Sequence, residues 1–292
     1  MGGSYSAEIS RDHPTCFLFL LDQSYSMTEP CAGDEARPKA NAAADAINNL
    51  IRTLIIRCTK NAKEGPRNYY EVGVIGYGSA RGVGPCFSKA LRGMDLVPTR
   101  HLASNPLRVE NRTRQIPDGA GRLTEVTVRF PVWFDPVAEA DTPMREAMQY
   151  AHKVLRQWTS GHKKSFPPMV INITDGMPNE DPRDAARALT SLSVDDGNVL
   201  LYNLHLSMLK HEPIMMPAQP NTLPDEFATM LFEMSSVFPE KIRQEFEIEG
   251  YNVPPGSRGF VFNMSADVLV RFIEVGTRTA LNRLASGEPT AR

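Results

Sequence analysis

The chain has 292 residues, of which 41% are hydrophobic and 23% are charged, and its formal net charge is −2. That length is ample for a buried core, and it fits one large α/β domain with insertions or one domain with a small companion. The near-neutral charge gives no indication of a nucleic-acid or membrane protein, and no apolar stretch is long enough for a transmembrane helix.

The first elements in chain order are two strands and the helix between them. The six apolar residues at 16–21 predict a strand over about 15–21 that is buried on both faces, and 69–78 predicts a second strand. A helix is expected from about 38 to 60, because apolar residues recur there at helical spacing. Three polar residues are expected on the outer face of this helix: Asn48, Asn49 and Arg52.

Residues 80–123 read as an insertion, because glycine, proline and isolated apolar residues alternate there without a sustained period. Between 80 and 130, nine Lys and Arg residues stand against four Asp and Glu residues, which predicts a basic surface. A hairpin is expected between 107–116 and 123–134, with the second segment as an edge strand. Two interpretations of this insertion stay open: a solvated loop, and a surface on which a partner docks. The candidate docking residues are Arg108, Arg112 and Arg114.

The second half of the chain alternates helices with strands. Thr142-Pro143 opens the next helix with a capping hydroxyl and a proline at the first helical position. Helices are expected at 143–158, 181–193, 225–236, 239–248 and 266–285, and strands at 168–174, 198–206 and 259–264. This alternation predicts an α/β fold with a doubly wound, mainly parallel sheet and helices on both faces.

We expect a single domain over 14–286, preceded by a flexible leader at 1–13 and followed by a tail at 287–292. A second, proline-rich insertion is expected at about 208–224. The four cysteines, at positions 16, 31, 58 and 86, have neither zinc-ligand spacing nor the pattern of a disulfide framework. Reduced cysteines favour a cytoplasmic location.

Oxygen-bearing side chains follow two of the predicted strands and precede one helix. Asp22, Ser24 and Ser26 follow the first strand, Thr142 precedes the helix at 143–158, and Asp175 follows the strand at 168–174. In a doubly wound sheet, ligands bind beyond the carboxyl ends of the strands, where the strand order reverses. Hard oxygen ligands suit a hard divalent cation, above all Mg²⁺.

This D-x-S-x-S…T…D pattern resembles the metal-ion-dependent adhesion site (MIDAS) of the von Willebrand factor type A domain (vWA domain). The resemblance covers about 15–79 and 124–285. It implies that Ser24, Ser26 and Thr142 coordinate Mg²⁺ directly, with Mn²⁺ or Ca²⁺ as substitutes. Asp22 and Asp175 would act mainly through bound waters and hydrogen bonds to the serines.

The resemblance also implies a function. A stand-alone intracellular module of bacterial type would use its metal to hold an Asp or Glu of a partner protein, without being an enzyme. Such a module would serve as an adaptor beside an ATPase, kinase, phosphatase or other effector in signalling, stress or defence. Asp141 departs from the family pattern, which has a glycine before the threonine, and is a further candidate for partner contact.

Two alternatives stay open. A Mg²⁺-dependent aspartyl phosphotransferase or phosphatase would use Asp22 as its nucleophile, but Ser24 stands where that chemistry commonly needs a second acid. The sequence also offers no clear basic residue to bind the transferred phosphate. A nucleic-acid-binding adaptor would use the basic insertion, which lacks an accompanying aromatic platform.

Overall fold

The computed structural model describes residues 4–31, 34–61, 63–117, 123–207, 211–263 and 272. Its strands are β1 (Thr15–Asp22), β2 (Pro30–Cys31), β3 (Asp34–Pro38), β4 (Tyr70–Ser79), β5 (Gly82–Pro85), β6 (Val97–Pro98), β7 (Arg108–Pro117), β8 (Leu123–Val132), β9 (Met169–Thr174), β10 (Ser193–Val194), β11 (Gly197–Asn198), β12 (Leu200–His205), β13 (Ile214–Met215) and β14 (Phe260–Phe262). Its α-helices are α1 (Lys39–Cys58), α2 (Thr99–Ser104), α3 (Met144–Gly161), α4 (Arg183–Ser191), α5 (Glu226–Met234) and α6 (Glu240–Ile248), and its 3-10 helices are η1 (Tyr25–Thr28) and η2 (Lys89–Leu91).

The main sheet has the order β13-β14-β12-β9-β1-β4-β5, and β6 also pairs with β4. Strands β4, β1, β9, β12 and β14 are parallel neighbours, whereas β5, β6 and β13 join the edges antiparallel. Along the chain, β4 follows β1 on one side and β9 follows on the other, so the strand order reverses between β1 and β9. The predicted doubly wound, mainly parallel sheet is confirmed.

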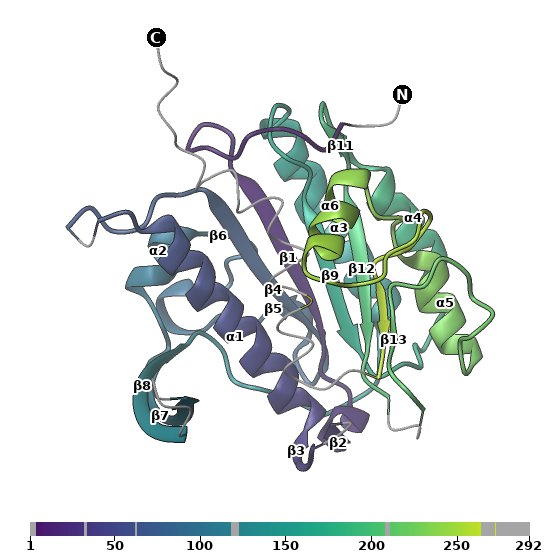
Figure 1. Cartoon of the computed structure of the whole chain (residues 1–292), viewed down its shortest axis with the longest axis horizontal. Coiled ribbons are helices and arrows are strands. Elements are labelled where there is room, and N and C mark those ends of the chain that lie inside the picture. Colours follow the sequence, from purple (N-terminus) through teal and green to yellow (C-terminus); the bar gives the residue numbers. More distant parts are fainter. Residues whose placement is uncertain are drawn as a thin grey trace.

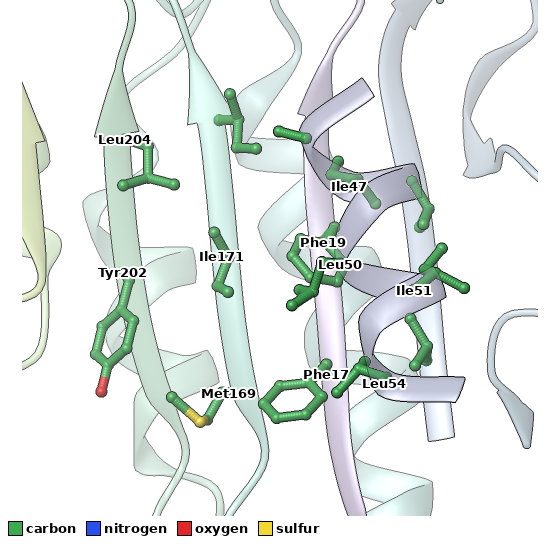
Figure 2. Close-up of a cluster of buried hydrophobic side chains, with 14 of the residues drawn as sticks. Phe17, Phe19, Ile47, Leu50, Ile51, Leu54, Met169, Ile171, Tyr202 and Leu204 are labelled. Carbon is green, nitrogen blue, oxygen red and sulfur yellow. The ribbon is translucent and has the colours of Figure 1, made fainter. Parts of the chain in front are cut away.

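Helices cover both faces of this sheet (Figure 1). On one face, Phe17 and Phe19 of β1 pack beneath Leu50 of α1, as Figure 2 shows. On the other face, Leu18 and Leu20 lie in the cluster built by α3, α4 and α5. Every residue of β1 is buried, which explains why the sequence between Thr15 and Asp22 is continuously apolar rather than alternating. Burial of each such apolar side chain stabilises the folded state by roughly 1.5–3 kcal/mol.

The stretch 80–123 takes part in the main sheet to a greater degree than its sequence indicates. Strands β5 and β6 both pair antiparallel with β4, and α2 follows directly. These strands have four and two residues, too short for a recognisable period. The hairpin of β7 and β8 is confirmed, and β8 is an edge strand of a separate two-stranded sheet, in which it pairs with β7.

Asn48 corrects a second expectation, since it is 1% exposed instead of lying on the outer face of α1. Its side chain accepts a hydrogen bond from the Trp133 backbone N–H (2.8 Å) and donates one to the Phe134 carbonyl (3.2 Å). The Trp133 indole in turn donates to the carbonyl of Leu102 in α2. The outer side of α1 is therefore covered where the hairpin rejoins the domain.

Described residues from the first and last parts of the sequence also contact the domain. Within the expected leader, the carboxylate of Asp196 accepts hydrogen bonds from the backbone of Ser6 and Ala7, which fixes this segment against the β10–β11 turn. At the other end, Phe272 is buried against Tyr202 as expected for an inward-facing residue. The rest of the predicted helix at 266–285, the tail at 287–292 and residues 208–210 of the second insertion lie outside the described residues.

The cysteines are free, and Cys16, Cys31 and Cys58 are buried. This agrees with the expectation that no disulfide framework is present. Across the described ranges, no helix combines the length and apolar character needed to cross a bilayer.

Candidate functional site

The predicted site lies where the strand order reverses. Leu21 of β1 pairs with Ile173 of β9, so the parallel neighbours end side by side. Asp22 is the last residue of β1, and Asp175 directly follows β9. The sheet topology therefore brings together two segments separated by about 150 residues of sequence.

A run of hydrogen bonds joins the hydroxyls after β1 to the carboxylate after β9. The Ser24 and Ser26 Oγ atoms lie 3.1 Å apart, and Ser26 Oγ donates to Asp175 Oδ1 at 2.8 Å. Ser24 is the extended residue before η1, and the 3-10 turn then returns Ser26 to the same side. Three of the five predicted metal ligands are thus linked through their oxygen atoms, with Ser26 between Ser24 and Asp175.

Asp22 is hydrogen-bonded to residues on both sides of this run of hydroxyls and carboxylate. Its carboxylate accepts hydrogen bonds from the Ser24 backbone N–H (2.9 Å) and from Thr174 Oγ1 (2.6 Å), and it has no exposed surface. Burial raises the pKa of Asp22 to about 6, although both hydrogen bonds oppose the shift. The nearby charge of Asp175 contributes a smaller part of this rise. A cation in the site would relieve the cost of holding both carboxylates charged.

The loop that carries Thr142 is hydrogen-bonded to both of the other loops. The Tyr25 backbone N–H donates to the Ala140 carbonyl at 2.8 Å, which aligns this loop with the serine loop. The backbone N–H of Thr142 donates to the Asn179 side chain, and Asn179 donates back to the Thr142 carbonyl. Thr142 is buried and its neighbour Asp141 is exposed. All five predicted ligands thus lie on three loops that are tied to one another.

Gly78, at the end of β4, permits this close approach. Its φ is +95°, and a Cβ there would lie 2.4 Å from the Asp141 carbonyl oxygen and 2.8 Å from the Ser24 nitrogen. Any side chain at Gly78 would therefore push the threonine and serine loops apart.

Lys39 is a member of the site that sequence reasoning missed. Its Nζ lies 3.0 Å from Asp175 Oδ2 and 2.9 Å from Glu29 Oε2, and its side chain is 3% exposed. Lys39 is the first residue of α1, where the positive end of the helix dipole disfavours a cation. The sequence did contain one signal for this role. A lysine at the first position of a long, partly apolar helix is unfavourable unless carboxylates lie close to its ammonium group.

His205 lies next to the loop that carries Asp175. Its Nε2 is 3.2 Å from the Asp175 carbonyl oxygen, and its ring packs edge-on against Phe262. Burial lowers the pKa of His205, which keeps the imidazole neutral. Gly176, with a φ of +135°, leaves room for this ring.

The donor set fits a hard cation. It consists of carboxylate and hydroxyl oxygens, which Mg²⁺ prefers over nitrogen or sulfur. Within the described ranges, no group of three or more His, Cys, Asp or Glu residues could hold a metal ion, so the hydroxyls of the serines and Thr142 would have to complete any such site. The buried ammonium of Lys39 offsets one of the two carboxylate charges.

The arginines proposed as docking residues are engaged within the hairpin region. Arg108 contacts Glu110 and Asp135, each at 2.6 Å. Arg112 pairs with Asp45 of α1 at 2.9 Å and stacks over the Phe130 ring. Arg114 lies on β7, and its side chain is outside the described part of the structure. The basic character predicted from the sequence is thus neutralised at Arg108 and Arg112.

No family model and no curated protein matches this chain. Solved structures similar to it include the PilB minor pilin from Streptococcus sanguinis (TM-score 0.45, 10% identity, 94% of this chain and 64% of the pilin). A second is the SpRpn10 VWA domain (TM-score 0.36, 12% identity, 68% of this chain and 77% of that domain). A third is the pilus adhesin RrgA from Streptococcus pneumoniae (TM-score 0.29, 15% identity, 59% of this chain and 21% of the adhesin). The chain thus spans less than two thirds of the pilin, and the fold class stated above rests on its own strand order.

Proposed function

We propose that this protein is a metal-dependent protein-interaction module of the vWA type, with Mg²⁺ as its preferred ion. The observation that carries the proposal is the run of oxygen atoms from Ser24 through Ser26 to Asp175, at the point where the strand order reverses. Asp22 would orient the serine loop from below, and Thr142 would complete the set from the third loop.

The bound cation would supply an electrophilic position that accepts a carboxylate oxygen from an Asp or Glu of a partner protein. The chain's own residues would do the rest. Neutral hydroxyls of Ser24 and Ser26 leave the ion's charge uncompensated, and the exposed Asp141 borders the approach. Repulsion from Asp141 would restrict how an acidic partner segment enters.

An adaptor role, in which the module joins an effector such as an ATPase, kinase or phosphatase in a bacterial signalling, stress or defence system, extends this proposal. It is supported by the resemblance of the motif. Arg108 and Arg112 already form ion pairs within the protein. The loops that carry Ser24, Thr142 and Asp175 are therefore the preferred docking surface, rather than the hairpin.

The phosphotransferase alternative gains one supporting observation, because Lys39 is a cation in the position that this chemistry needs. Two observations oppose it. The side chain of Asp22 has no exposed surface, and its two oxygens already accept hydrogen bonds from Ser24 and Thr174. A nucleophile in that state cannot reach a phosphate without rearrangement of β1.

Affinity capture from cells, with and without a chelator, tests the proposal. The wild type should retain a partner in Mg²⁺ and release it on chelation, and the Ser24→Ala/Ser26→Ala variant should retain none. Capture that is indifferent to both the chelator and the double substitution would contradict a metal-mediated contact.

A further inference from the structure

We infer that Lys39 is a built-in competitor for the metal: its ammonium neutralises Asp175 until a divalent cation displaces it toward Glu29, and so it sets the ion affinity of the site. This inference rests on the proposed function, and it concerns how that site is regulated.

The first observation is the unequal environment of the two carboxylates that Lys39 contacts. Asp175 is 5% exposed in its side chain, whereas Glu29 is 48% exposed. A charge pair with Asp175 is therefore held in a low-dielectric setting, and a pair with Glu29 is held near water. Lys39 bridges a buried anion that needs compensation and a solvated anion that does not.

The second observation is how the oxygens of Asp175 are shared. Oδ1 accepts the hydrogen bond from Ser26, and Oδ2 contacts Lys39. Any cation that recruits the charge of Asp175 must therefore compete with Lys39 for the same carboxylate. A divalent ion close to the ammonium would also be repelled by it, since like charges in a buried site are weakly screened.

The third observation is a route for displacement. Lys39 Nζ already lies 2.9 Å from Glu29, so a small swing of its flexible side chain keeps one carboxylate partner. The backbone N–H of Lys39 also donates to the Glu29 carbonyl, which fixes the two residues relative to each other. Glu29 directly follows η1, the turn that carries Ser26. Movement of Lys39 would therefore act on the serine loop as well as on Asp175.

Isothermal titration of Mg²⁺ into purified full-length chain tests this competition. Lys39→Met removes the charge but keeps a long flexible side chain, and it should bind Mg²⁺ about tenfold more tightly than the wild type. Arg37→Met is the matched control, because Arg37 lies two residues earlier and pairs with Asp45 instead. That control should change the affinity less than about twofold.

Two further variants keep the inference testable if Lys39→Met does not fold. Lys39→Arg retains the charge, and Glu29→Gln removes the solvated partner so that Lys39 remains on Asp175. Lys39→Arg should therefore bind Mg²⁺ within about twofold of the wild type, whereas Glu29→Gln should weaken Mg²⁺ binding severalfold. Glu180→Gln, at an exposed carboxylate beside Asn179, controls for the general loss of a negative charge and should have a smaller effect than Glu29→Gln.

The outcomes separate the two hypotheses. Unchanged or weaker binding in Lys39→Met, with binding still abolished by Ser24→Ala/Ser26→Ala, would overturn the role of Lys39 and leave the metal site intact. For a Lys39→Met chain that does not fold, equal effects of Glu29→Gln and Glu180→Gln would overturn it likewise. Absence of Mg²⁺ binding in wild type, Lys39→Met and Lys39→Arg alike would overturn the proposed function and this inference with it.

Discussion

The loops after β1 and β9 and the β7–β8 hairpin both contain charged pairs, but the two regions use them differently. At the site, Lys39 and Asp175 are almost fully buried, 3% and 5% exposed. In the hairpin, Arg108 and Asp135 are 43% and 54% exposed. Solvent screens the hairpin pair, so its contribution to stability is small, whereas breaking the buried pair leaves a charge without water.

This contrast shows why counting charges along the sequence missed both the pairing of some arginines and the role of Lys39. Nine cations against four anions in 80–130 predicted a basic surface, yet Arg112 reaches Asp45, which lies far away in the sequence. Lys39, by contrast, belongs to no cluster, and its importance comes from burial alone. Exposure, not composition, decides which charge matters.

The largest effect should follow from breaking the buried pair. Lys39→Met is expected to lower the free energy of unfolding by about 3 kcal/mol without metal, because Asp175 is left buried and unpaired. Saturating Mg²⁺ should recover part of this loss by binding the folded state. Urea denaturation with and without Mg²⁺ measures both quantities, and a loss below that of Arg108→Met would contradict the contrast.

Separating the loops of the site should cost nearly as much. Gly78→Ala is expected to destabilise the fold by about 2–3 kcal/mol, since its Cβ would meet the Asp141 carbonyl oxygen and the Ser24 nitrogen. Gly82→Ala is the control: its φ is also positive, +74°, but nothing lies within 4 Å of the added atom. Thermal denaturation that ranks Gly82→Ala as the more harmful change would show that the loops are not in close contact.

The root of the hairpin is the next most sensitive place. Asn48→Ala removes the partners of the Trp133 N–H and the Phe134 carbonyl, and should cost about 2 kcal/mol. Asn49→Ala, on the same helix but partly exposed, should be within about 0.5 kcal/mol of the wild type. Equal effects of the two substitutions in chemical denaturation would argue against the anchoring role of Asn48.

The smallest effect is expected in the hairpin itself. Arg108→Met should change the free energy of unfolding by less than about 1 kcal/mol, because its ion pairs with Glu110 and Asp135 are solvated. Any loss should shrink as salt is raised from 0.05 to about 0.5 M. A large loss of unfolding free energy that does not depend on salt would show that the Arg108 pairs contribute to stability as the buried Lys39–Asp175 pair does, and would contradict the contrast.

Much of the fold could be predicted from the sequence, because burial on both sheet faces leaves continuous apolar runs such as 16–21, and the apolar stripe along α1 is long. The closeness of Asp22 and Asp175 could also be predicted from the sequence, since the carboxyl ends of parallel strands lie at the same edge of the sheet. Strands as short as β6, with two residues, have no period to detect. The burial of Asn48 depends on Trp133, a contact that no local pattern encodes.

Lys39 could not be found by motif reasoning, because the D-x-S-x-S…T…D pattern contains no cation. Its contact with Asp175 spans 136 positions and depends on the tertiary fold, which places the first residue of α1 beside the loop after β9. The available signal was energetic: a lysine at the first residue of a buried helix opposes the helix dipole unless carboxylates surround it.

Titration of Mg²⁺ into the wild type and into Ser24→Ala/Ser26→Ala, followed by calorimetry, tests the metal site most directly. A matched control is Ser160→Ala/Ser191→Ala, whose hydroxyls bond only to carbonyls of their own helices among the described contacts. We expect one Mg²⁺ per chain in the wild type and the control, and at least about a tenfold loss of affinity in the site variant. Equal Mg²⁺ binding by all three proteins would contradict the account.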